Sequence, residues 1–561
     1  MSTCLAPLIP AQLPPFVAYL RHASHDVCPE ARATWLKAAE HLHPIDDAAL
    51  AALIHTLLQQ QSLPEALAVA EVWSQLCPDS AAACFQFGYV LQMAGRHGDA
   101  LVPYSQAMTH EPDYPQLRNN LAAAIRVSGG DPDEALILLE QAVEVDASDS
   151  NAWINLISAR CAAVDLAGAL AAGQRAVELA PSNPLACNNY ALALKEAGRW
   201  DDAEVYARAA TEVAPGDATF HHNLSLLYLA RGNYAQGWPE HESRWAGSHE
   251  LRERLPALPG PQWNGEPLDG KTLLVWGEQG MGDVLQFCRL LPSLAERVHG
   301  ENGRIEWNSF PQMGHLLERS LGAYVDGLTL GGGIESLPRF DYHLPLLSVP
   351  LVLNLREETI PAAPYLRADR ERTERWNARL ADETRLKVGL AWTGSLTHQR
   401  NPYRRVALEL CAQMLKDIDG VAFYSLQPGA TDDVDAAWRA GFELMSYADE
   451  FKTFDDTAAF VSSLDLVITV CTSVAHLSGA LGRPTWVLLD VNPHWPWLLG
   501  RTDSPWYPST TLYRQEEFGK WAPVLRKVRK DLSCLAQDRL RRSNRGESIG
   551  QTRLNNAAIN A

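Results

Sequence analysis

The sequence predicts an α-helical repeat superhelix followed by an α/β region built on parallel sheets. Three observations support this prediction. The chain has 561 residues, which is too long for one hydrophobic core. In its first half, small residues recur about every 34 positions, which is the pattern of stacked helix pairs. In its second half, short apolar runs alternate with helical stretches, which is the pattern of a doubly wound parallel sheet.

The bulk composition excludes several classes of protein. The formal net charge is −19, so the surface is not basic enough for a general nucleic-acid binder or a binder of anionic membranes. The ten cysteines form neither a CxxC pair nor a cluster with zinc spacing, and we therefore expect no disulfide framework and no metal site. The N-terminal residues lack the features of a signal peptide, and no apolar run is long enough to span a membrane. We therefore expect a cytoplasmic protein.

Three series of residues recur in register along the first half. The first series, spaced by 34, 35, 34 and 34 residues, is Ala66, Ala100, Ala135, Ala169 and Ala203. The second, spaced by 35, 34 and 34 residues, is Ala107, Ala142, Ala176 and Ala210. The third, at the expected helix ends, is Pro78, Pro112, Ala147, Pro181 and Pro215. Small residues let paired helices approach closely, and proline ends a helix. We therefore predict repeats over residues 48–245, preceded by a helical N-terminal cap over residues 1–47.

This pattern resembles the tetratricopeptide repeat (TPR), most clearly in residues 88–112, where Gly88, Ala100, Ala107 and Pro112 occupy motif positions. Such helices stack into a superhelix whose concave groove holds a peptide or protein. Asparagines recur near the start of the first helices and can hydrogen-bond the backbone of an extended peptide: Asn119, Asn120, Asn151, Asn155, Asn188, Asn189 and Asn223. The alternative is that they are polar residues on a solvated helix face.

The second half begins with a segment rich in proline and glycine, residues 251–270, which reads as a linker or an entry strand. The candidate strands that follow are residues 272–276, 304–309, 386–392, 421–427, 464–470 and 484–490. We predict two Rossmann-like domains, residues 246–370 and 371–535. Ligands of such sheets bind beyond the carboxyl ends of the strands, so we expect a cleft between the two domains. Residues 536–561 are polar and basic, and we expect them to form a disordered tail.

The turn after the first candidate strand reads GEQGMGD, residues 277–283. Its glycines let the backbone turn tightly and approach a ligand, although their spacing is not that of a dinucleotide-binding GxGxxG motif. Asp283 stands at the start of the next helix. There it can cap the helix, or it can act on a substrate as an acid–base group. Glu278 is a second candidate base in the same turn.

A second turn of this kind follows the candidate strand 464–470. Thr472 and Ser473 place hydroxyls and backbone N–H groups at a helix N-terminus, which favours an anion. His476 lies in the first turn of that helix and can face the anion. The alternatives are that Thr472 is an ordinary cap and that His476 is a hydrogen-bonded core histidine. Nothing in the sequence lowers the pKa of the neighbouring Cys471, so we do not expect a nucleophile there.

Two further stretches carry candidate binding residues. The polar loop after the candidate strand 386–392 can supply hydrogen-bond donors to a diphosphate, and otherwise is a solvated basic loop: Thr393, Ser395, His398, Arg400, Arg404 and Arg405. Residues 490–508 concentrate large aromatic side chains among prolines: Trp495, Trp497, Trp506 and Tyr507. They form either a stacking platform for a base or sugar or a proline-stiffened aromatic core.

Taken together, these stretches resemble the GT-B glycosyltransferases, specifically the ADP-heptose lipopolysaccharide heptosyltransferase family. The family's Met-Gly-Asp-Val-Leu pattern is intact at residues 281–285, with Pro292 at a familiar distance. Its Ser-His-Leu helix element matches residues 473–482. The resemblance covers residues 270–515, and the architecture is similar to bacterial proteins that join TPRs to this module and to protein O-GlcNAc transferase. In those bacterial proteins an aspartate usually stands where this chain has Cys471.

The resemblance implies a metal-independent, inverting glycosyltransferase that uses a nucleotide sugar as co-substrate and needs no cofactor. It implies Asp283 as the general base, with Glu278 as the second candidate, and Arg405 in place of a lysine of the heptosyltransferases. The implied donor-binding residues are Gly280, Gly282, Thr393, Arg405, Gln427, Thr472, Ser473, Val474 and His476.

The implied acceptor is a protein or peptide that lies along the repeat groove. Two alternatives stay open. In the first, the repeats bind a partner and the sugar-nucleotide fold is inactive, an alternative that Cys471 favours. In the second, the enzyme acts on a saccharide or lipid acceptor and the repeats serve only assembly.

Overall fold

The computed structural model describes residues 10–248, 250–252, 255–278, 280–396, 398 and 400–544. The chain divides into two compact units, Met1–Ala193 and Leu194–Ala561, and each is described by itself. Within the described residues, no helix combines the length and the apolar character that crossing a bilayer requires.

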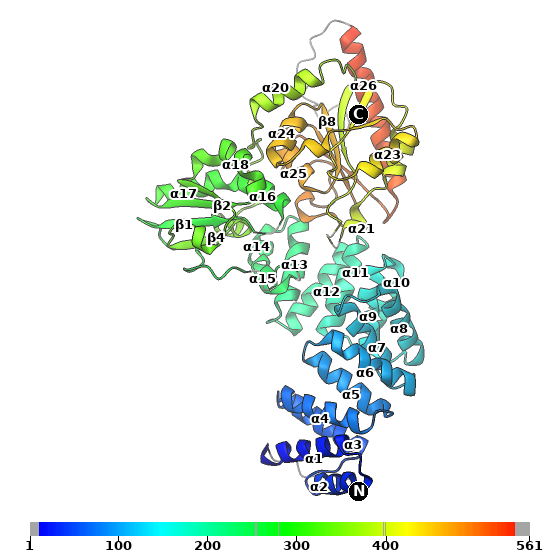
Figure 1. Ribbon diagram of the computed structural model, residues 1–561. Helices are drawn as coiled ribbons and strands as arrows, with labels where there is room; N and C mark the ends of the chain where they lie inside the picture. Colours follow the sequence, from blue (N-terminus) through cyan, green and yellow to red (C-terminus); the bar gives the residue numbers. More distant parts are fainter. Residues whose placement is uncertain are drawn as a thin grey trace. The chain divides into compact units, whose positions relative to one another are not determined.

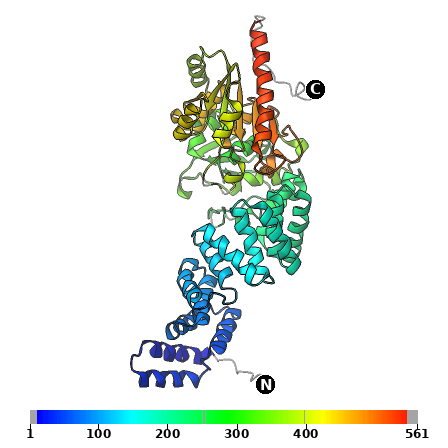
Figure 2. The same cartoon turned by 90° about the vertical axis from the view of Figure 1, so that its right-hand side faces the viewer.

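The first unit consists of helices that pack in consecutive pairs (Figure 2). They are α1 (Leu13–His25), α2 (Pro29–Glu40), α3 (Asp47–Gln59), α4 (Leu63–Leu76), α5 (Ala81–Met93), α6 (His97–His110), α7 (Leu117–Val127), α8 (Pro132–Val145), α9 (Ser150–Ala162), α10 (Leu166–Leu179) and the start of α11 (Pro184–Glu196). Gly88 shows why small residues recur, because a Cβ there would lie 2.7 Å from the Tyr104 ring. The alanines at the other repeat positions, such as Ala100 and Ala107, are fully buried. The predicted cap is helical over α1 and α2, and residues 1–9 lie outside the described residues.

The second unit begins with the end of α11 and four more helices, α12 (Trp200–Val213), α13 (Ala218–Ala230), α14 (Tyr234–His241) and α15 (Arg244–Gly247). A four-stranded parallel sheet follows, in the order β3-β2-β1-β4 (Figure 1). Its elements are β1 (Thr272–Trp276), α16 (Met281–Phe287), α17 (Leu291–Gly300), β2 (Arg304–Ser309), α18 (Gly314–Leu321), β3 (Gly327–Leu330), β4 (Tyr342–Pro345) and α19 (Val349–Val352). The described part of the Pro- and Gly-rich segment before β1 contributes an isolated bridge, from Gln262 to His343.

The second sheet has six parallel strands in the order β10-β9-β8-β5-β6-β7. Its elements are α20 (Arg370–Arg379), β5 (Leu386–Ala391), α21 (Asn401–Arg404), α22 (Leu408–Leu415), β6 (Val421–Ser425), α23 (Thr431–Arg439), β7 (Leu444–Ser446), α24 (Phe454–Ser462), β8 (Leu466–Val470), α25 (Ser473–Ala480), β9 (Thr485–Leu489), β10 (Thr510–Arg514) and α26 (Trp521–Asn544). All residues of β6, β8 and β9 are buried, as expected for parallel strands covered on both faces. The prediction of a disordered tail from residue 536 is wrong as far as Asn544, because α26 continues to that residue. Residues 545–561 lie outside the described residues.

The aromatic stretch after β9 is a core and not an exposed platform. Trp497, Trp506 and Tyr507 are fully buried, and Trp495 is 5% exposed. Trp495 packs edge-on against Trp238 of α14, with ring centroids 5.4 Å apart. The same cluster of buried residues includes α13, α14, β1, α16 and the loop after β9. The last repeat helices therefore share one hydrophobic core with the first sheet and with that loop of the second sheet.

This shared core predicts a large effect of truncating Trp238, which is 1% exposed. We expect Trp238→Ala to destabilise the protein by about 3–5 kcal/mol, because it removes a fully buried indole from a closed core. Urea unfolding of the full chain measures the loss. Trp438→Ala is the matched control, since that indole is 50% exposed and makes one hydrogen bond, to the Leu444 carbonyl. The control is expected to lose about 1 kcal/mol. Equal losses in the two variants would contradict the shared core.

Candidate functional site

The turn between β1 and α16 meets the turn between β8 and α25, so the structure brings the two specific sequence motifs together. Gly282 marks the contact, because a Cβ on it would lie 3.5 Å from Cδ2 of His476 and 3.6 Å from Cα of Ser473. α16 and α25 pack against each other throughout this region. Both distances are those of ordinary van der Waals contact, so the two helix starts lie side by side at Gly282.

Asp283 caps α16 and is also an unusual carboxyl group. Its Oδ2 accepts a hydrogen bond from the backbone N–H of Gly280, at 3.1 Å. The side chain is half-buried, and burial raises the pKa of Asp283 to about 6, with further increases from the charges of Glu278 and Glu250. Asp283 therefore caps the helix as the third residue of α16, while Gly280 occupies the N-cap position. A carboxyl group with this pKa can also exchange a proton near neutral pH, so the role of general base stays a prediction.

Glu278 is not available as a base. Its side chain is fully buried and both oxygens accept hydrogen bonds from Arg244 of α15, at 2.8 and 2.9 Å. Oε1 also accepts from the backbone N–H of Leu347, at 2.8 Å. This geometry contradicts the prediction of Glu278 as a second candidate base. The sequence gives no local sign of the ion pair, because Arg244 lies in a stretch without a recognisable motif.

The start of α25 has the geometry of an anion-binding helix N-terminus. Thr472 is the N-cap, and its hydroxyl accepts from the backbone N–H of Val474, at 3.2 Å. Thr472, Ser473 and Val474 are all partly exposed, and the backbone N–H groups of Val474 and Ala475 donate to the hydroxyl and the carbonyl of Thr472. The cap alternative for Thr472 is confirmed, and its position still allows the predicted anion contact.

His476 is a core histidine. Its Nδ1 lies 2.9 Å from the Tyr507 hydroxyl, and its ring stacks on Trp497 with centroids 5.2 Å apart. Burial lowers the pKa of His476 to about 3, and the nearby Arg289 charge lowers it further. His476 is therefore neutral at physiological pH. It supports the α16–α25 contact and supplies no positive charge to an anion.

Of the two neighbouring arginines in the basic loop after β5, Arg404 is the one that contacts the turn before α25. Nη1 of Arg404 donates to the carbonyl of Cys471, at 2.9 Å, which places its charge beside Thr472. Its Nε is buried and has no hydrogen-bond partner within the described residues. Arg405 is exposed. Thr393, at the start of the loop, is held by Asn401, whose amide donates to its hydroxyl at 3.0 Å.

Cys471 is part of the packing between these elements. It is 8% exposed, and its Sγ accepts from the indole N–H of Trp497, at 3.1 Å. Burial raises the pKa of the Cys471 thiol. The prediction that Cys471 is not a nucleophile therefore agrees with its surroundings.

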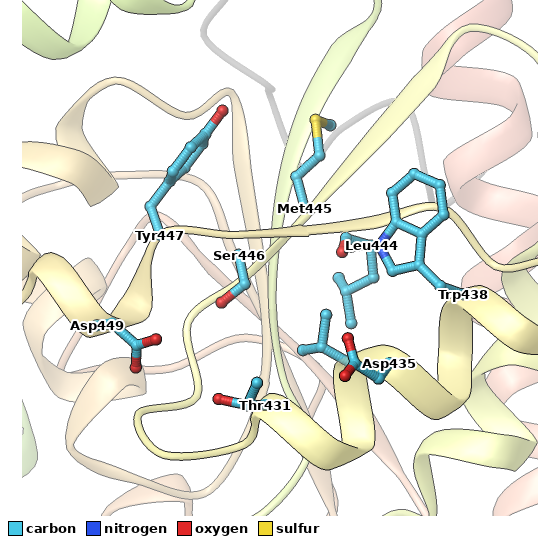
Figure 3. Close-up of a pocket in the computed structure, with 9 residues that line it drawn as sticks. Thr431, Asp435, Trp438, Leu444, Met445, Ser446, Tyr447 and Asp449 are labelled. Carbon is cyan, nitrogen blue, oxygen red and sulfur yellow. Dashed lines mark hydrogen bonds between the residues drawn. The ribbon is translucent and has the colours of Figure 1, made fainter.

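Gln427 follows β6 at the same carboxyl edge of the second sheet and is half-buried. Further along this edge, between α23 and β7, lies a hollow of about 380 Å³ (Figure 3). Thr431, Asp435 and Trp438 of α23 face Leu444 and Ser446 of β7 across it. None of the predicted site residues lines this hollow, and its two carboxylates, Asp435 and Asp449, disfavour a phosphate.

In the first unit, three of the asparagines predicted to face a peptide form hydrogen bonds between repeats: Asn119, Asn155 and Asn189. Asn155 donates to Oδ1 of Asn119, at 2.8 Å. Asn189 donates to the Ile154 carbonyl and to the Ser158 hydroxyl, at 3.4 and 3.3 Å. These contacts link consecutive first helices. Asn155 and Asn189 are half-buried, so their amides also reach the surface between the repeats.

The raised pKa of Asp283 predicts a specific dependence of stability on pH. The folded protein holds this proton more tightly than the unfolded chain, so the stability that the proton contributes is lost as the pH rises through about 6. Thermal unfolding of the wild type and Asp283→Asn, from about pH 4 to about pH 7, should show the variant gaining about 1–2 kcal/mol relative to the wild type. This difference in stability is smaller than the free energy that corresponds to the full pKa shift, because solvent screens the partly exposed carboxyl group.

Asp369 is the control, because its contribution to stability changes with pH in the opposite direction. It caps α20, and the hydrogen bond from the backbone N–H of Arg372 lowers the pKa of its carboxyl group. Asp369→Asn should therefore lose stability relative to the wild type as the pH rises toward about 4 from more acidic values, with no further change above that pH. If both variants follow the same direction, the environment assigned to Asp283 is wrong.

Comparison with known proteins agrees with the helical part of this description. The sequence profile of the tetratricopeptide repeat matches residues 120–184 and 190–247, which are therefore TPRs. The chain is similar to Protein FlbA of Caulobacter vibrioides, with 28% identity over 439 residues that cover 74% of this chain and 72% of FlbA.

Solved structures with remote similarity include three helical proteins. The APC/C hetero-tetramer Cut9–Hcn1 is 17% identical with a TM-score of 0.35, over 41% of this chain and 45% of the matched chain. YrrB, described as a TPR protein with an unusual peptide-binding site, is 20% identical with a TM-score of 0.27, over 32% of this chain and 92% of YrrB. Pseudomonas aeruginosa PilF is 17% identical with a TM-score of 0.32, over 37% of this chain and 96% of PilF.

Proposed function

We propose that this chain is a cytoplasmic glycosyltransferase of the GT-B fold, which transfers a sugar from a nucleotide-sugar donor to a protein or peptide bound by the repeats. The observation that carries the proposal is the contact at Gly282, where the Asp283 turn of one parallel sheet meets the start of α25 from the other. An acid–base group and an anion-binding helix start therefore face one small region of space.

The second sheet supplies the groups for the donor. The N-terminus of α25 carries partial positive charge, and Arg404 adds a full charge beside it through its contact with the Cys471 carbonyl. Both stabilise a diphosphate, more strongly as negative charge develops on it when the glycosidic bond breaks. Thr393 and Gln427 follow adjacent strands, β5 and β6, at the same carboxyl edge of the sheet. The nucleotide is expected along this edge.

The first sheet supplies the base. In the proposed step an acceptor hydroxyl or amide attacks C1 of the donor sugar, Asp283 takes the acceptor's proton, and the bond from C1 to the diphosphate oxygen breaks. The leaving diphosphate carries away the bonding electron pair. A carboxyl group with a pKa of about 6 is ionised at neutral pH and is a stronger base than an ordinary aspartate.

The first unit supplies the acceptor site. TPRs bind extended segments in their concave groove, and residues 120–184 and 190–247 of this chain match the tetratricopeptide repeat. A protein or peptide acceptor is proposed over a saccharide or lipid because the repeats offer this surface.

A second candidate function is a scaffold in which the repeats bind a partner and the sheets bind no donor. Cys471 favours it, because a buried thiol stands where similar bacterial proteins have an aspartate. The two candidates differ in one property that can be measured directly, the binding of a nucleotide sugar.

The proposal is tested by thermal shift and hydrolysis assays of the full chain with a panel of nucleotide sugars. We expect one donor to stabilise the wild type and to be hydrolysed slowly. Arg404→Ala should weaken donor binding about 10-fold or more, because it removes a charge-assisted contact. Asp283→Asn should bind the donor normally and lose about 10²- to 10⁴-fold in turnover, because it keeps the cap and removes the base.

Arg405→Ala is the matched comparison, since the resemblance points to Arg405 and the structure points to its neighbour. A larger effect at Arg405 would correct the assignment of the donor-binding arginine without removing the proposal. If no nucleotide or nucleotide sugar stabilises the wild type, the glycosyltransferase proposal fails and the scaffold remains.

A further inference from the structure

A buried ion pair fastens the Asp283 turn to the last repeat helix. Arg244 of α15 and Glu278 of the turn have no exposed side-chain surface, and the guanidinium binds both carboxylate oxygens. The same guanidinium donates to the Ser348 hydroxyl, at 2.8 Å, and to Oε1 of Glu242, at 2.8 Å. Glu278 additionally holds the backbone N–H of Leu347. Three segments that are distant in the sequence therefore meet at one carboxylate, five residues before Asp283 in the chain.

A second ion pair fastens the Arg404 loop to the end of α11. Arg400 donates from Nε and Nη2 to the two oxygens of Glu196, at 2.9 and 2.8 Å. Its Nη2 also lies 3.4 Å from Oδ2 of Asp490, the residue after β9. The side chains of Glu196 and Asp490 are 14% and 3% exposed. Arg400 caps the short helix α21, whose last residue is Arg404.

We propose that the last repeat helices are part of the catalytic machinery, with Arg244 positioning the Asp283 turn and Glu196 positioning the Arg404 loop. This inference rests on the proposed glycosyltransferase function. Neither residue touches the reacting atoms; each acts through the loop that it holds.

The Asp283 turn depends on such an anchor because its sequence is rich in glycine. The Arg404 loop contains the four-residue helix α21, and Arg400 is the residue that precedes this helix. The Asp283 turn contains three glycines in seven residues, so its backbone is intrinsically free to adopt other conformations. A planar guanidinium that binds a carboxylate through two parallel hydrogen bonds fixes both distance and orientation. Displacement of a reacting group by about 1 Å can cost a factor of about 10² in rate, so a fixed turn matters more for catalysis than for folding.

The two anchors predict different kinetic defects. Arg244→Gln should lower the turnover of donor hydrolysis about 30- to 100-fold and leave the donor Kd within about threefold, because it releases the base and not the donor site. Glu196→Gln should raise the donor Kd about 10-fold and leave turnover at saturating donor within about threefold, because it releases the arginine loop. Arg244→Lys keeps the buried charge, loses the two-pronged contact and should lose about 10-fold in turnover. It serves in place of Arg244→Gln if that variant does not fold.

Arg319→Gln is the matched control. Arg319 of α18 also binds both oxygens of a buried carboxylate, Asp455 of α24, at 2.6 and 3.0 Å, and contacts neither loop. It should lower the melting temperature and leave both Kd and turnover unchanged. If the Arg244 and Glu196 variants behave like this control, the two residues are merely structural and the inference is overturned.

Hydrogen exchange of the protein without donor separates this inference from the proposed function. Arg244→Lys should speed exchange in the peptide that covers residues 277–285, and Glu196→Gln in the peptide that covers residues 393–406. Unchanged exchange in both peptides overturns the positioning roles, even in a protein that hydrolyses a donor. Faster exchange in a protein that binds no donor supports the anchors while the glycosyltransferase function fails.

Discussion

The apolar core shared by the last repeat helices and the sheets is the constraint on which the rest of the second unit depends. Trp238 of α14 packs edge to face against Phe287 of α16 and against Trp495 of the loop after β9, and the Phe287 and Trp495 rings are tilted against each other, with ring centroids 5.4 to 6.2 Å apart. Each such ring removes a large apolar area from water, so the three segments that carry them are costly to separate. The same core includes residues of α16 and α25, so it holds these two helices against each other. The contact at Gly282 is a consequence of this packing.

The buried charged side chains of the second unit are also part of this shared core. Arg244, Glu278 and Arg289 lose their hydration in this core, and each is compensated by specific partners rather than by water. Arg289 is held by the Trp506 carbonyl and by the faces of Tyr365 and Tyr507, with its guanidinium carbon 4.6 and 4.4 Å from their ring centroids. Its charge helps to keep His476 neutral. Buried ion pairs add little net stability compared with apolar packing, but they specify orientation. In the proposed mechanism the Arg244–Glu278 pair specifies the orientation of the turn that bears Asp283.

The sequence was a good guide where the signal is local or strictly periodic, and a poor one where the partner is distant. The repeats are visible because close helix packing demands a small residue at the same place in every pair, as at Gly88 and Ala100. The central strands are visible because both of their faces are buried. Strands β3, β4, β7 and β10 are short or partly exposed and give no such run. Asp283 and Thr472 could be proposed from their turns and from the family resemblance. The burial and pairing of Glu278 could not be predicted from the sequence, because they depend on Arg244 and on the Leu347 backbone. The choice between Arg404 and Arg405 could not be predicted either, because it depends on the contact with the Cys471 carbonyl.

The effect of Cys471 on its surroundings therefore follows from the contacts that it makes, and not from its difference from the family pattern. Arg404 binds the backbone carbonyl at this position, which any residue provides. The Sγ atom accepts the Trp497 N–H, a contact that keeps the turn packed against the aromatic core. A buried aspartate here would place a negative charge directly beside Arg404 and the start of α25. Within the described residues Arg404 forms no ion pair with a carboxylate. Because the Cys471 thiol is neutral, it does not compensate the positive charge of Arg404. An uncompensated guanidinium at a helix N-terminus favours an anion more strongly than a paired one. A thiol in place of an aspartate therefore changes the charge beside Arg404 and the start of α25.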